Sequence, residues 1–108
     1  MLSQLMLVAL ATAEPAYLAC EIPQEGGKLA VEVALDEASQ GAVVTLPKTG
    51  YVSRGPTVWS ASKVEVAEKD QRWIIDRATG EITRTFSFSA NVEKGTCTRR
   101  SAPAKRVF

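Results

Sequence analysis

Hydrophobic and polar residues alternate along much of the chain, most clearly in residues 28–36. This segment reads KLAVEVALD, where every second residue from Leu29 to Leu35 is Leu or Val and the residues between are Ala or Glu. A period of two residues over this length indicates a strand with one buried face. Residues 28–36 are therefore predicted to form a half-buried β-strand.

Shorter segments rich in β-branched, aliphatic and aromatic residues predict further strands, separated by turn-forming clusters. They are residues 16–22, 41–47, 57–61, 63–68, 73–76, 81–89 and 94–99. Seven or eight strands at a spacing of about ten residues are typical of antiparallel meanders. The sequence thus predicts an all-β fold, a small meander that forms a barrel or a compact sandwich.

The clearest predicted hairpin joins residues 73–76 to residues 81–89. Asp76 can accept hydrogen bonds from backbone amides in the turn, and Gly80 can take a positive φ without a Cβ clash. One face of the second arm carries Ile82, Arg84, Phe86 and Phe88. We expect this face to be buried, together with Trp73.

Residues 1–13, MLSQLMLVALATA, have the features of a cleavable export signal. The apolar run is too short to span about 30 Å of hydrocarbon as a helix, and Ala11 and Ala13 fit an A-x-A cleavage site. Because no Lys or Arg precedes this run, an apolar helix packed on the core is the alternative. The signal interpretation leaves one domain, residues 14–108, in the periplasm or secreted, without stable membrane insertion after cleavage.

The composition fits a single small domain. The chain has 108 residues, 45% of them hydrophobic and 23% charged, and a formal net charge of +1. This balance disfavours both a disordered chain and a nucleic-acid binder. Residues 94–108 nevertheless carry five basic and no acidic side chains. This basic end either contacts an acidic partner or polyanion, or folds back on the acidic body with Val107 and Phe108 as a last strand.

The sequence contains two cysteines, Cys20 and Cys97. In an oxidising compartment an even count favours disulfide formation, and two cysteines allow only one pairing. The bond would join the first strand to the last. We predict a structural role for it, since the C-x-x-C spacing of redox pairs is not found.

The types of side chain present restrict the chemistry. The sequence has no His, the usual base for Ser and Cys nucleophiles and the commonest metal ligand. No Gly-rich segment matches a phosphate-binding or dinucleotide motif. We predict no enzyme, no catalytic residues, no metal site and no cofactor. The alternative is a hydrolase that uses carboxylates alone, such as Asp76 with Glu81, although these flank a predicted surface turn.

Residues 50–59 form the longest turn-rich connection, and we expect the binding surface there. Tyr51, Arg54 and Trp59 are its candidate partner-binding residues, because aromatic and arginine side chains commonly anchor interfaces. The favoured hypothesis is a monomeric binding module for a protein partner in the cell envelope, for example an inhibitor of an envelope or foreign enzyme. The alternatives are a carrier of a small apolar ligand and a structural envelope protein.

Several motifs occur together in residues 14–108. They are the early Cys20, the segment from Trp73 to Gly80, the Gly95-Thr96-Cys97 stretch and a basic end that finishes on Phe108. This combination resembles small uncharacterised exported proteins of bacteria, mainly over the second half of the domain. The resemblance implies a secreted β-domain.

A weaker similarity is to the c-type lysozyme inhibitors. That family consists of small periplasmic β-barrels with a disulfide, in which a Ser-Gly-x-x-Tyr motif makes the inhibitory contact. The nearest stretch in this chain is Thr49-Gly50-Tyr51, which lacks the Ser and the two-residue spacing.

Overall fold

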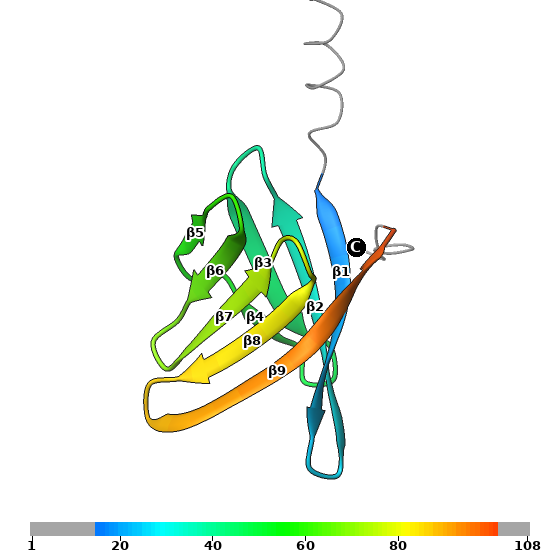
Figure 1. Ribbon diagram of the computed structural model, residues 1–108, viewed down its shortest axis with the longest axis vertical. Helices are drawn as coiled ribbons and strands as arrows, with labels where there is room; N and C mark the ends of the chain where they lie inside the picture. The colour runs from blue at the N-terminus through cyan, green and yellow to red at the C-terminus, as the bar shows by residue number, and fades with distance from the viewer. Residues whose placement is uncertain (1–14, 102–108) are drawn as a thin grey trace, which may run out of the picture.

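The computed structural model describes residues 15–101 and shows one antiparallel β-sheet in this range (Figure 1). Its strands are β1 (Ala16–Gln24), β2 (Gly27–Asp36), β3 (Gly41–Leu46), β4 (Tyr51–Ser53), β5 (Thr57–Trp59), β6 (Lys63–Ala67), β7 (Gln71–Asp76), β8 (Glu81–Phe86) and β9 (Ser89–Arg100). The all-β prediction is confirmed. The proposed export signal at residues 1–13 and the proposed last strand at Val107 and Phe108 lie outside the described residues.

The two edge strands of the sheet follow each other directly along the chain. The order is β4-β3-β2-β1-β9-β8-β7-β6-β5, so β1 and β9 pair in the middle while β4 and β5 are the two edges. The sheet curls on itself and brings β3 next to β5 and β6 (Figure 1). The result is a half-barrel with a seam between its two edge strands.

The structure has nine strands, where seven or eight were expected, because residues 51–53 form an additional short strand, β4, ahead of the predicted strand at 57–61. Within residues 50–59, Tyr51 pairs with Leu46 on β3, and Trp59 pairs with Val64 on β6. Residues 54–56 carry the chain across the seam, with Ala67 N donating to Pro56 O at 2.9 Å. The segment therefore behaves as one interrupted strand that changes partner half-way.

The concave face of the sheet holds the hydrophobic core. Its buried side chains come from most of the strands and include Cys20, Ile22, Val31, Val33, Ala42, Val44, Leu46, Val64, Val66, Trp73, Ile75 and Ile82. They occupy alternate positions along each strand, as period-two patterning requires. Trp73 is fully buried, as predicted.

The predicted strand over 81–89 is too long at its C-terminal end. β8 stops at Phe86, residues 87–88 form a tight turn, and Ser89 pairs back with Phe86. Because the chain reverses there, the alternation that buries Ile82 does not reach Phe88. Phe88, expected in the core, is 73% exposed at the hairpin tip. The expected strand over 94–99 is the second half of the longer β9.

The disulfide joins Cys20 on β1 to Cys97 on β9, 77 residues apart in the chain and directly opposite each other in the sheet. Beside it, Gly95 lies so close to β1 that an added Cβ would meet the carbonyl oxygen of Glu21. Pairing of β9 with β1 ends at Thr96, and beyond that point β9 pairs only with β8. Gly95 thus marks the point where the two strands separate.

Candidate functional site

Toward the end of the sheet that holds the β6–β7 and β8–β9 turns, the concave face becomes polar. The polar positions continue the core alternation: Glu68 follows Val64 and Val66, and Arg84 stands between Ile82 and Phe86. We call this cluster the polar mouth, and its members are Gln24, Tyr51, Glu68, Gln71, Arg84 and Glu93. They come from five strands and the β6–β7 turn.

One half of the polar mouth bridges the seam. The Tyr51 hydroxyl lies 2.8 Å from each carboxylate oxygen of Glu68, and Gln71 Nε2 donates to Glu68 Oε1 at 2.8 Å. β4 pairs only with β3, so this contact links it by side chains to the β6–β7 turn. Tyr51 and Glu68 therefore join the two sides of the seam.

The other half extends the hydrogen bonds to β1. Arg84 Nε donates to Gln71 Oε1 at 2.7 Å, and Arg84 Nη1 lies 3.2 Å from Glu93 Oε1. Gln24 Nε2 then donates to Glu93 Oε2 at 3.2 Å. This last contact spans the region beyond Gly95, where β9 and β1 no longer pair.

Arg84 is held on its flat faces as well as at its edges. Its guanidinium carbon lies 4.9 Å from the Trp73 ring centroid and 4.7 Å from that of Phe86. Its side chain is only 17% exposed. Cation–π contact and the Glu93 ion pair offset the loss of hydration of this charge. Arg84 is therefore fixed in position.

The charge states of the polar mouth follow from these contacts. Partial burial acts to raise the pKa of Glu68. The nearby Ser53 hydroxyl, the hydrogen bonds from Tyr51 and Gln71, and the Arg84 charge act to lower this pKa, and their combined effect is larger, so the net shift is downward. Ser53 is fully buried, and its Oγ does not reach full hydrogen-bond geometry with any partner. Donation to Glu68 raises the pKa of Tyr51. At neutral pH Glu68 is thus ionised and Tyr51 is neutral.

The opposite end of the sheet holds a pocket of about 290 Å³ with an apolar wall and a charged rim. Its apolar wall is formed by Leu18, Leu35, Trp59 and Ile75, and its charged rim by Glu37, Asp76, Arg77 and Arg99. We call it the Trp59 pocket. Arg77 lies over the Trp59 ring at 5.0 Å and pairs with Glu37 at 3.0 Å, while the buried Trp59 Nε1 has no partner among the described residues.

The three predicted partner-binding residues lie on three different surfaces. Tyr51, 41% exposed, belongs to the polar mouth, and the half-buried Trp59 belongs to the Trp59 pocket. Arg54 is exposed and lines an outer groove of about 410 Å³ together with Val52 and Arg100. The 50–59 segment crosses from one edge of the sheet to the other, so its side chains are not brought together.

Sequence reasoning missed the remaining members of the polar mouth. Their common signal is a charged or amide side chain at a position that the period-two pattern assigns to the core, such as Arg84 and Gln71. This signal becomes informative only when several neighbouring strands carry such a residue at the same level along the strand direction. The order and register of the strands, which the sequence does not provide, determine which residues lie at the same level.

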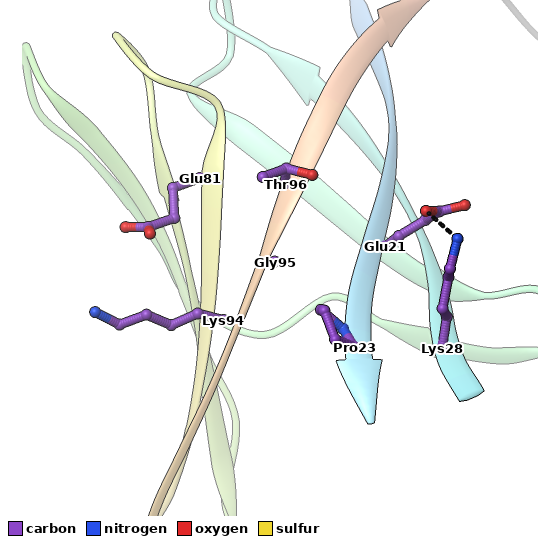
Figure 2. Close-up of a pocket in the computed structure, with 7 residues that line it drawn as sticks. All are labelled: Glu21, Pro23, Lys28, Glu81, Lys94, Gly95 and Thr96. Atoms are coloured by element: carbon purple, nitrogen blue, oxygen red, sulfur yellow. Dashed lines mark hydrogen bonds and ion pairs between the residues drawn. The ribbon is translucent and has the colours of Figure 1, made fainter. Parts of the chain in front are cut away.

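A further groove of about 420 Å³ lies on the outer face above Gly95 (Figure 2). Figure 2 shows the Glu21 and Lys28 pair, 3.3 Å apart, on one side and Glu81 with Lys94 on the other. Glu21 and Lys28 are both well exposed, so their pairing contributes little stability. The groove has mixed charge and no apolar anchor beyond Pro23.

Within residues 15–101 no group of three or more His, Cys, Asp or Glu side chains is placed to hold a metal ion. In the same range no helix is long and apolar enough to cross a membrane. A scan against protein-family models, a search of curated proteins and a search of solved structures each find no match.

Proposed function

We propose that the protein is an exported, non-enzymatic binding module that takes a side chain of a protein partner into the Trp59 pocket. The observation that carries this proposal is the exposed end of the core at Leu18, Leu35 and Trp59, next to Arg77 and Arg99. Interface anchors commonly fill apolar pockets beside aromatic and arginine side chains. An inhibitor of an envelope or foreign enzyme is one form that such a module takes.

The disulfide supports an oxidising compartment, either the periplasm or the outside of the cell. Cys20 and Cys97 lie opposite each other in the sheet, so the bond joins two strands that are already paired. An oxidising compartment agrees with the export signal expected at residues 1–13.

A binding role also agrees with the contacts of Asp76, which was named above as a candidate for a hydrolase that uses carboxylates alone. Asp76 accepts backbone hydrogen bonds from Ala78 at 2.8 Å and Thr79 at 3.0 Å. This carboxylate shapes a turn, which explains its presence without a catalytic role. Glu81 follows the same turn and is exposed.

The Trp59 pocket also favours the second candidate, a carrier of a small apolar ligand. Its volume of about 290 Å³ is near the lower end of small-molecule sites, which begin at about 300 Å³. A carrier would co-purify with such a ligand, and native mass spectrometry would detect the added mass. A binding module for a protein would be isolated without it.

The test is capture from envelope extract with the oxidised protein as bait, at low and at high salt. Ala16 lines the Trp59 pocket, so Ala16→Trp fills the pocket without removing a core side chain. Ala90→Trp, at an exposed position on β9, is the matched control. We expect one dominant protein to be retained by the wild type and by Ala90→Trp and lost with Ala16→Trp. Equal retention by both variants would exclude the Trp59 pocket as the binding surface.

A further inference from the structure

We propose that the polar mouth, with the pocket beside it, binds an acidic saccharide. This site lies at the other end of the sheet from the Trp59 pocket and goes beyond the binding function proposed above. The adjoining pocket has a volume of about 310 Å³, shares Glu68 and Gln71 with the polar mouth, and is also lined by Phe86. Its other lining residues are Lys69, Arg72, Thr85 and Ser87.

Hydrogen-bonding capacity is the first argument. A sugar hydroxyl donates one hydrogen bond and accepts others, so it is best recognised by planar side chains that offer both roles side by side. The internal bonds of Glu68 and Gln71 leave acceptor lone pairs on Glu68 Oε2 and Gln71 Oε1 for ligand hydroxyls. Lys69 and Arg72, which line the adjoining pocket, supply the donors. Because hydrogen bonds within the polar mouth already hold Glu68 and Gln71 in place, little side-chain entropy is lost when a ligand binds.

Aromatic surface is the second argument. Phe88 is 73% exposed, and its ring centroid lies 5.3 Å from that of Phe86, which lines the pocket. Tight hairpin turns usually contain Gly, Asn or Asp. An exposed Phe in such a turn gains little from packing within its own chain. The C–H face of a sugar ring packs well against such an aromatic surface, so an external ligand explains the position of Phe88.

Charge is the third argument, and it selects an acidic sugar. Lys69 and Arg72 are exposed at the pocket, and among residues 15–101 neither has an ion-pair partner within 4.0 Å. The charge of Arg84, by contrast, is taken up by Glu93. The ionised Glu68 also lines the pocket, so two positive side chains there face one negative side chain. A carboxylate or sulfate on the ligand would therefore meet an excess of positive charge, from two cations without an ion-pair partner.

The test is calorimetric and NMR titration of the oxidised protein with a tetramer of galacturonic acid. Its carboxyl-reduced tetramer is the neutral comparison, and inorganic phosphate is the small-anion comparison. We expect the acidic tetramer to bind and to shift the amide signals of residues 68–72 and 85–88. We expect the neutral tetramer to bind about tenfold or more weakly, which corresponds to loss of one charge-assisted contact.

Variants at exposed positions keep the fold intact and separate the contributions. Phe88→Ser and the double change Lys69→Gln with Arg72→Gln should each weaken binding about tenfold. The controls are Val58→Ser and Lys63→Gln, exposed positions on β5 and β6 that do not line this pocket. Absence of binding, unchanged affinity in both test variants, equal binding of the neutral tetramer, or equal shifts with phosphate would each overturn the proposal. None of these results depends on the Ala16→Trp capture experiment.

Discussion

Asp76 shows how one carboxylate can define a hairpin. It accepts hydrogen bonds from the amides of Ala78 and Thr79, and Gly80 completes the turn with a φ of 80°. The hydrogen bond from Thr79, followed by that from Ala78, lowers the pKa of Asp76. Sequence reasoning predicted this turn because all of its determinants are local.

Asp76→Asn should lower the melting temperature and make the melting temperature less dependent on pH in the acidic range. Because the folded pKa of Asp76 lies below the unfolded value of about 3.9, its contribution is complete above that value and is lost as pH falls through the folded pKa. Thermal unfolding of wild type and variant from about pH 2 to pH 6 checks this. Glu81→Gln is the control for the loss of one negative charge, and a constant difference across that range would contradict the prediction.

Gly95 illustrates a residue whose role is visible only in three dimensions. A Cβ at this position would meet the Glu21 carbonyl and lie 2.8 Å from Ile22 Cα. Gly95→Ala should therefore lower the free energy of unfolding by about 1–3 kcal/mol, as overpacking does. Urea unfolding measures the change. Gly41→Ala, where a Cβ would meet only the Ser39 hydroxyl at 3.2 Å, should have a much smaller effect, and equal effects would contradict the explanation.

At the scale of elements, the predictable strands are those with several alternating residues. β2 and β6 were predicted close to their observed bounds because Leu or Val recurs at every second position, and β3 because Gly41 and Pro47 bound it. β4 was not predicted, because three residues are too few for alternation to be recognised, whereas β5 lies within the predicted strand 57–61. The end of β8 was missed because the Ser87-Phe88 turn contains no Gly, Pro, Asn or Asp.

The seam makes a prediction about β4. Tyr51→Phe removes the hydroxyl that links β4 to Glu68 and should cost about 0.5–1.5 kcal/mol of stability. Amide hydrogens of β4 should exchange faster, which hydrogen-exchange NMR measures. Tyr17→Phe on the outer face is the matched control. Unchanged exchange in β4 would show that the Tyr51–Glu68 contact does not hold the seam together.

At the scale of the whole molecule, the disulfide fastens the middle of the sheet. Cys20 and Cys97 join the strands at which the β1–β4 half meets the β5–β9 half. The sequence predicted this pairing from the cysteine count alone. It did not predict that the seam lies between β4 and β5, because edge position depends on long-range pairing.

Removal of the disulfide should destabilise the whole fold. For a loop of 77 residues the chain-entropy model gives about 4.5 kcal/mol, comparable to the total stability of a small domain. Urea unfolding of the oxidised and reduced protein measures the loss. The double variant Cys20→Ala with Cys97→Ala should unfold at a low urea concentration and should not respond to reductant. An unchanged midpoint after reduction would contradict this prediction.

The pairing of β1 with β9 has a consequence for how the chain can be rewired. Tyr17 near the start of β1 and Arg100 at the end of β9 are direct neighbours in the sheet, while residues 54–56 cross its seam. A circular permutant that links the two ends and begins within residues 54–56 would run from β5 through β9 and β1 to β4. Its strands would then follow one another along the chain in the same order as in the sheet, a plain up-and-down meander with its termini at the edges.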